Sequence, residues 1–307
     1  MIVLTTSVIS AVCSVKPVKG KKSVGMKQRI REEREKEKRI AYVVAAAILI
    51  TVIGVSSFLV VSMLNQPSNN NNANPTSQHK AAIVDHLSLT APNQTFVNTA
   101  THILEQAGYN VTYYSGEEVT VSFYKDLPSL GYELIVLRVH STAANPDRPE
   151  TAPVTLFTSE RYTQSNYIGE QLSDQLVIVT YSDEDYAKGI TYFGINPEFV
   201  TNAAGRFQNT TIIMMGCGGL DNPSMAAAFV QKGSKVYISW DGPVTAEHSD
   251  QATIDLLHKL TLEKQVIRVA VEGTMNEVQP DPIFRSVLAY YPLIQGSQTI
   301  KTPTENP

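Results

Sequence analysis

From Lys80 onward, short apolar segments alternate with stretches of helical periodicity. Apolar runs of this kind are typical of buried strands, and apolar residues spaced three and four apart are typical of helices. The expected strands cover residues 81–87, 111–114, 133–140, 154–158, 175–181, 211–216, 235–240 and 286–291, and the expected helices cover 95–107, 223–232, 246–262 and 264–272. Because strands and helices alternate, the pattern predicts an α/β fold: a mostly parallel sheet sandwiched by helices.

A different apolar pattern lies nearer the N-terminus. Residues 40–64 contain no Asp, Glu, Lys or Arg, and a helix of that length is sufficient to cross a hydrocarbon core of about 30 Å. Lys and Arg are concentrated before this segment, whereas the next charged residue after it is Lys80. Since the positive flank stays in the cytoplasm, the sequence predicts a single-pass protein of the cell membrane. Its N-terminus would be cytoplasmic and its C-terminal domain would lie outside.

Composition then divides the chain into five parts. We expect a basic cytoplasmic segment at 1–39, the transmembrane helix at 40–64, a flexible Asn-rich stalk at 65–79, the α/β domain at 80–293 and a disordered tail at 294–307. The whole chain has a net charge of −4 although its N-terminal segment is basic, so the domain itself is acidic. An acidic domain argues against a nucleic-acid partner, which requires a concentrated basic patch. The membrane is the expected partner through 40–64, and the sequence does not set the oligomeric state.

Two expected strands end in residues that carry chemistry. The segment ELIVLRVH ends in His140, and the segment TIIMMG is followed by Cys217, with glycines on both sides. Parallel α/β sheets place their active sites at the carboxyl ends of strands, so neighbouring strands would bring imidazole and thiol together. A histidine can activate a thiol, and small neighbours leave the Cys217 N–H accessible to an oxyanion. The other reading is that both residues are structural, because a lone cysteine most often behaves as a small buried hydrophobe.

The sequence around these residues resembles the caspase–haemoglobinase fold, which includes caspases, legumains, separases and gingipains. The strand ending in His and a small residue, the strand ending in Cys-Gly, the helix of small residues and the strand ending in Trp follow that family's order. The segment IIMMGCGGLDNPSMAAAFVQKGSKVYISWDGPVTAEHSD is closest to gingipain-like and CHAT-type members. The matching positions are Cys217, Ala228, Phe229, Gly233, Ser234, Lys235, Ile238 and Trp240. The resemblance covers residues 80–293 and is most specific over 212–250.

The resemblance implies a cysteine peptidase that uses a His–Cys dyad. His140 would be the general base and Cys217 the nucleophile, and the N–H groups of Ser141 and Cys217 would form the oxyanion hole. Ser141 stands where the family usually has glycine. Trp240 and Asp241 would line the primary specificity pocket, where an acidic residue favours a basic residue before the scissile bond. The alternative reading of Asp241 and Gly242 is an ordinary turn.

The implied function is cleavage of a peptide or protein substrate through a thioester, without a metal or other cofactor. One alternative is a catalytically inactive caspase-like domain used for surface binding or signalling. Another is a binding domain of a different parallel α/β type, which would require His140 and Cys217 to lie far apart.

Overall fold

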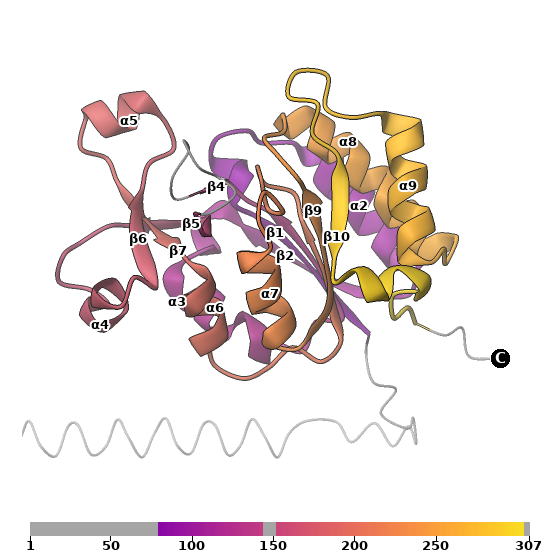
Figure 1. Ribbon diagram of the computed structural model, residues 1–307, viewed down its shortest axis with the longest axis horizontal. Coiled ribbons are helices and arrows are strands. Elements are labelled where there is room, and N and C mark those ends of the chain that lie inside the picture. Colours follow the sequence, from indigo (N-terminus) through magenta and orange to yellow (C-terminus); the bar gives the residue numbers. More distant parts are fainter. Residues whose placement is uncertain (1–78, 144–151, 304–307) are drawn as a thin grey trace, which may run out of the picture. The chain divides into compact units, whose positions relative to one another are not determined.

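The computed structural model describes residues 79–143 and 152–303. All of them belong to one compact unit, Pro75–Pro307. The centre of this unit is a six-stranded sheet with the strand order β10-β9-β8-β3-β1-β2 (Figure 1). Its strands are β1 (Lys80–Asp85), β2 (Asn110–Ser115), β3 (Leu134–Arg138), β8 (Thr210–Met214), β9 (Ser234–Trp240) and β10 (Leu288–Tyr291). They pair in parallel except β10, which runs antiparallel to β9 at one edge.

Helices cover both faces of this sheet. One face carries α2 (Gln94–Gln106), α8 (Ala246–Leu257) and α9 (Ile267–Val278), and the other carries α3 (Val121–Asp126), α6 (Pro197–Asn202) and α7 (Ser224–Gln231). Helix α2 begins after Asn93, whose side chain accepts a hydrogen bond from the Phe96 N–H at 3.1 Å and so caps the helix. The strands are buried on both faces because each face has its own helix layer, which accounts for their nearly continuous apolar sequences.

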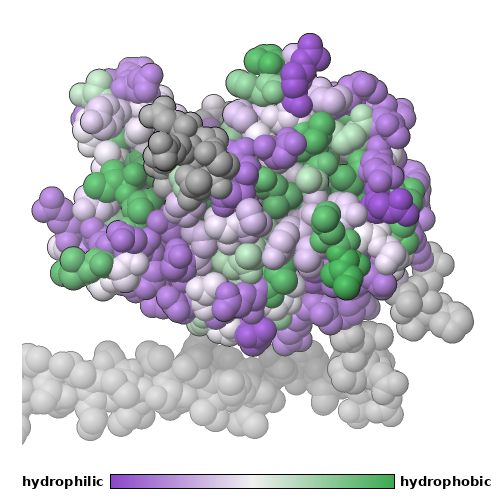
Figure 2. Space-filling model, viewed as in Figure 1, coloured by the Kyte–Doolittle hydropathy of each residue, from purple (hydrophilic) through white to green (hydrophobic). Residues whose placement is uncertain are grey.

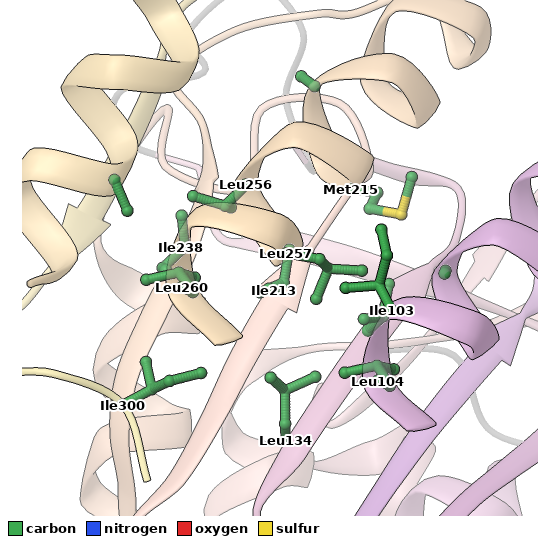
Figure 3. Close-up of a cluster of buried hydrophobic side chains, with 14 of the residues drawn as sticks. Ile103, Leu104, Leu134, Ile213, Met215, Ile238, Leu256, Leu257, Leu260 and Ile300 are labelled. Carbon is green, nitrogen blue, oxygen red and sulfur yellow. The ribbon is translucent and has the colours of Figure 1, made fainter. Parts of the chain in front are cut away.

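The core under α8 joins residues that are distant in the sequence. Leu134, Ile213 and Ile238 come from three adjacent strands, and each has no more than 1% of its surface exposed. Figure 3 shows them beneath Leu256 and Leu257 of α8, with side chains of α2 alongside. Packing of this kind is the main stabilising contribution to the domain.

A second, smaller sheet lies beside the main one. It is four-stranded and antiparallel, with β4 (Ser141–Ala143), β5 (Val154–Arg161), β6 (Leu176–Val179) and β7 (Tyr192–Ile195) in the order β4-β5-β7-β6. The short helices α4 (Ile168–Leu172) and α5 (Asp183–Ala187) flank β6, at the left of Figure 1. Apolar surface is exposed over this part and at the tip of the loop between α9 and β10 (Figure 2).

The predicted fold class, one helix-covered sheet preceded by a transmembrane helix, is therefore wrong in two respects. The expected strands at 154–158 and 175–181 belong to the separate antiparallel sheet. Within residues 79–143 and 152–303, no helix is both long enough and apolar enough to cross a membrane. The predicted transmembrane helix at 40–64, like the segments 1–39 and 65–78, lies outside the described residues. The predicted single-pass membrane localisation and the membrane partnership through 40–64 accordingly receive no support and are withdrawn.

The domain also extends beyond the boundary expected at residue 293. Residues Leu293–Ser297 form a short 3-10 helix, and the Gln298 carbonyl accepts a hydrogen bond from the Ile267 N–H at 2.9 Å. Ile300 is only 4% exposed and lies in the same apolar cluster as Leu134 and Leu260 (Figure 3). The prediction of a disordered tail starting at 294 is thus wrong at least as far as residue 303.

This ordered tail gives a test of stability. Replacing Ile300 by Ala is expected to lower the free energy of unfolding by about 2–5 kcal/mol, because it leaves a cavity in the core. The matched control is Ile294→Ala, since Ile294 is 80% exposed and its loss is expected to change stability by less than about 0.5 kcal/mol. Urea unfolding followed by circular dichroism measures both. Equal effects of the two substitutions would show that the tail does not contribute to the core.

Candidate active site at the carboxyl edge of the main sheet

The register of β3 and β8 places His140 and Cys217 at the same edge of the sheet. The two strands are parallel neighbours, and Leu137 pairs with Met214. His140 and Cys217 each follow that pair by three residues. The segments that carry them therefore leave the sheet side by side at its carboxyl edge, where α/β proteins form their active sites.

A hydrogen bond joins these two segments directly. The Ser141 hydroxyl, which is buried, donates to the Cys217 carbonyl oxygen at 2.7 Å. The close approach requires glycine at 216, because a Cβ there would meet the Ser141 hydroxyl and the Val139 carbonyl oxygen. Ser141, for which the resemblance implies an oxyanion role, fixes the position of the cysteine loop.

Cys217 is partly buried against the core under α8, and its thiol donates to the Val244 carbonyl oxygen at 3.5 Å. Its neighbour Gly218 donates its N–H to the Gly242 carbonyl oxygen at 2.8 Å, so the loop after β8 is bound to the loop after β9. In the described part of the chain, no backbone carbonyl accepts a hydrogen bond from the Cys217 N–H, although this N–H interacts with the residue's own sulfur. An incoming oxygen would therefore meet no carbonyl competitor for that N–H.

Burial raises the pKa of the Cys217 thiol above its ordinary value of 9.0, and the nearby carboxylates of Asp221 and Asp281 raise it further. Because a thiolate is the reactive form, free Cys217 is expected to react slowly with iodoacetamide at pH 7. The rate should keep rising through pH 9 as the thiol ionises. Peptide mapping by mass spectrometry distinguishes the Cys217 adduct from one at Cys13. A rate that is already maximal at pH 7 would contradict the raised pKa.

The His140 ring contacts a different set of groups. Its Nε2 shares a hydrogen bond of 2.8 Å with the Thr90 hydroxyl, while Nδ1 makes none within the described residues. Tyr181 stacks on the ring with a centroid distance of 5.8 Å. Burial lowers the pKa of His140 below 6.5, and the positive charge of Arg138 lowers it further. His140 is therefore unprotonated at neutral pH and can accept a proton.

The structure brings the two segments together, but among the described residues the His140 ring and the Cys217 thiol share no hydrogen bond. His140 Nε2 is instead bonded to the Thr90 hydroxyl, and the Cys217 thiol is bonded to the Val244 carbonyl oxygen. The thiol pKa is raised and the imidazole pKa is lowered, so both groups are neutral at pH 7. The arrangement favours proton transfer during nucleophilic attack over a thiolate–imidazolium pair formed in advance.

The two residues predicted to line the specificity pocket lie in different environments. Trp240 has no exposed surface, and its indole N–H donates to the Ser249 hydroxyl at 2.9 Å. The prediction that it contacts substrate is wrong in this structure, because Trp240 is part of the core. Asp241 is exposed just after β9, and one of its carboxylate oxygens accepts the Val287 N–H at 2.8 Å.

The carboxylate of Asp281 organises the loop between α9 and β10. Asp281 has no exposed surface and accepts hydrogen bonds from the N–H groups of Thr245, Ile283 and Phe284 at 2.8–3.0 Å. Burial alone would raise the pKa of Asp281, but these N–H donors lower it to about 2. Asp281 is therefore ionised at neutral pH and holds this loop against the segment that contains Val244.

Sequence reasoning missed a buried ionic cluster directly below the site. Arg138 is 1% exposed; its guanidinium donates to Asp85 at 2.8 Å and to both oxygens of Asp250 at 2.7 and 2.9 Å. Arg138 and Asp85 are opposite each other in the register of β1 and β3. One signal could have revealed it: an arginine within the apolar run ELIVLRVH must find a counter-charge once that strand is buried.

The chain matches no protein-family model, and no curated protein is similar enough to count as a relative.

Proposed function

We propose that this domain is a cysteine peptidase of the caspase-like type, in which Cys217 is the nucleophile and His140 the general base. The observation that carries the proposal is the pairing of Leu137 with Met214, from which the segments that carry His140 and Cys217 leave the sheet at the same carboxyl edge. The bond from Ser141 to the Cys217 carbonyl holds the two segments in that relation. The likeness of the sequence around Cys217 to gingipain-like and CHAT-type members points to the same reaction.

The proposed reaction begins with the neutral pair. As the sulfur of Cys217 bonds to the substrate carbonyl carbon, the thiol proton moves to His140. Nδ1 accepts it when Nε2 carries the ring hydrogen and donates it to the Thr90 hydroxyl. The carbon–nitrogen bond then breaks, and His140 gives the proton to the leaving amine. Water attacks the resulting thioester and its proton passes through His140, which releases a carboxylic acid and restores the thiol. Hydrogen bonds of this kind often tighten only when substrate is bound.

The N–H of Cys217 supports an oxyanion site, since no backbone carbonyl among the described residues accepts from it. The N–H of Ser141 is the second proposed donor. Both proposed donors then belong to the two segments that the Ser141–Cys217 hydrogen bond joins.

The surroundings of Cys217 support a preference for a basic residue before the scissile bond. The exposed Asp241 carboxylate follows β9. Its negative charge adds to burial in raising the pKa of the nearby Asp221. The loops after β8 and β9 are hydrogen-bonded through Gly218 and Gly242, so Asp241 lies on a segment adjoining the nucleophile. A substrate cation would be attracted there by charge pairing.

The test is hydrolysis of fluorogenic peptides that differ only in the residue before the fluorophore: Arg, Lys, Gln or Asp. The expected result is cleavage after Arg and Lys that is lost in Cys217→Ala. Asp241→Asn should weaken the preference for Arg over Gln while hydrolysis itself persists. Hydrolysis that is unchanged in Cys217→Ala, or that is absent for all four peptides, would reject the proposal.

The second candidate function is binding by a catalytically inactive domain of the same fold. Two observations favour it: the raised pKa of Cys217 and the lack of a hydrogen bond between His140 and Cys217 in the described residues. It predicts that peptides bind without being cleaved.

A further inference from the structure

Aromatic side chains that the proposed reaction does not use pack around the ring of His140, a residue that is partly exposed. Tyr181 lies over it with an interplanar angle of 26°, and His86 approaches it nearly at a right angle, with centroids 5.8 Å apart in both cases. Phe157 closes a third side at 5.9 Å. These rings come from the loop after β6, from the 3-10 helix His86–Leu89 after β1, and from β5.

A chain of hydrogen bonds fixes two of these rings to the backbone. The Tyr181 hydroxyl donates its one proton to the Thr158 carbonyl oxygen at 2.8 Å. Its oxygen must then accept from His86 Nε2 at 2.9 Å, which places the His86 proton on Nε2. His86 Nδ1 is consequently a bare acceptor, fully buried and without a partner in the described residues.

His86 remains uncharged beside the proposed base. Burial lowers the pKa of His86 to about 3, and the neighbouring His140 contributes to the lowering. The charged or titratable groups that face His140 are therefore His86, Tyr181 and the Arg138 guanidinium, which is itself paired with Asp85 and Asp250. A neutral His86 leaves His140 as the group that takes up the proton.

Residues of the second sheet pack against the Tyr181 ring. Tyr192 of β7 stacks on Tyr181 with centroids 4.0 Å apart and an interplanar angle of 11°. The Arg161 guanidinium at the end of β5 lies over the Tyr192 ring at 4.8 Å, which is a cation–π contact. A continuous stack thus runs from the antiparallel sheet to the His140 ring.

We propose that Tyr181 and His86 form a positioning unit for the His140 base, through which the second sheet sets the orientation of the imidazole and excludes water from it. The Tyr181 hydroxyl fixes orientation through His86, and the Tyr181 ring excludes water. Within the described residues, neither Tyr181 nor His86 forms a hydrogen bond with the His140 ring. This inference rests on the proposed function, since it assigns a role to residues around its base.

Two substitutions separate the hydroxyl from the ring. In Tyr181→Phe the stack remains but the His86 Nε2–H loses its acceptor, so kcat is expected to fall by about tenfold with KM unchanged. In Tyr181→Ala the face of His140 becomes exposed to water, and kcat is expected to fall by about a hundredfold. Tyr186→Phe is the matched control. Tyr186 lies on α5, the helix that follows β6 of the second sheet, and is 72% exposed. Its hydroxyl makes no hydrogen bond within the described residues.

The second readout is the titration of His140 by nuclear magnetic resonance, with its signal assigned from the spectrum of His140→Ala. Burial lowers the pKa of His140 in the wild-type protein, so Tyr181→Ala should move it back toward 6.5. The pH at which activity falls on the acid side should rise by the same amount as the pKa of His140. Tyr181→Phe keeps the ring in place and should leave the pKa low while kcat falls.

The titration needs no turnover, so the two proposals can fail separately. If Cys217-dependent hydrolysis is absent but His140 still responds to Tyr181→Ala, the peptidase proposal fails and the enclosure of His140 stands. If hydrolysis occurs but neither kcat nor the His140 titration differs from the Tyr186→Phe control, the positioning unit is rejected. It is equally rejected if the Tyr181 variants lose only thermal stability.

Discussion

Replacing Arg138 by Met is expected to lower the free energy of unfolding by about 3–5 kcal/mol, because it leaves two buried carboxylates without their cation. Asp85 and Asp250 are 1% and 5% exposed, and both bind the Arg138 guanidinium directly. Burial alone would lower the pKa of Arg138, but its bonds to Asp250 and Asp85 raise the pKa above its ordinary value. Arg138 therefore stays charged, and its loss removes the cation that both aspartates bind.

Chemical denaturation of the purified domain measures this effect. The matched control is Lys188→Met, which breaks the exposed pair of Lys188 and Glu184 and should cost no more than about 1 kcal/mol. Replacing Arg138, Asp85 and Asp250 together by apolar residues should restore much of the stability, since no uncompensated charge is then buried. An Arg138→Met protein as stable as the Lys188→Met control would show that the cluster is not buried as described.

Replacing His140 by Ala is expected to lower kcat by roughly 10²- to 10⁴-fold, the range that a general base contributes. The wild-type activity should fall on the acid side, because the base must be unprotonated to act. The pKa of His140 is below 6.5, so activity is retained at pH 6.5 and is lost as the pH falls through that lowered value. In His140→Ala this acid limb should disappear along with the rate.

The matched control is His102→Ala, since His102 is exposed on α2 and makes no contact with the site. Stopped-flow or steady-state hydrolysis of an arginyl peptide between pH 4 and 9 gives both kcat and its pH dependence. A His140→Ala enzyme with the wild-type rate and the same pH profile would exclude His140 as the base.

Strong periodic patterns in the sequence predicted the strands and helices around the main sheet, but they did not reveal the second sheet. The apolar run at 133–140 and the helix at 95–107 correspond to β3 and α2 within a few residues. Strand β7 has only four residues and includes Gly194, whose lack of a Cβ is required by the close approach of Thr155 and Val179. Such a strand shows no periodicity, because tertiary packing and not local pattern defines it.

Local sequence placed His140 and Cys217 at strand ends, but it could not show which groups they contact. The Thr90 hydroxyl on His140 and the Val244 carbonyl on Cys217 come from distant loops. The assignment of Trp240 to a pocket failed because an indole at a strand end can turn inward, where Ser249 satisfies its N–H. His86 and Tyr181 carried no sequence signal, since their role follows only from the packing of two sheets against His140.

The central claim, a thiol activated by His140, is tested most directly with a peptidyl electrophile that carries arginine and reacts with cysteine. The labelled protein is mapped by mass spectrometry in the wild type, in His140→Ala and in Cys217→Ala. We predict rapid labelling of Cys217 in the wild type, labelling slowed by at least about a hundredfold in His140→Ala, and none in Cys217→Ala. Labelling of Cys217 at the same rate in the wild type and in His140→Ala would reveal an accessible but unactivated thiol and would contradict the claim.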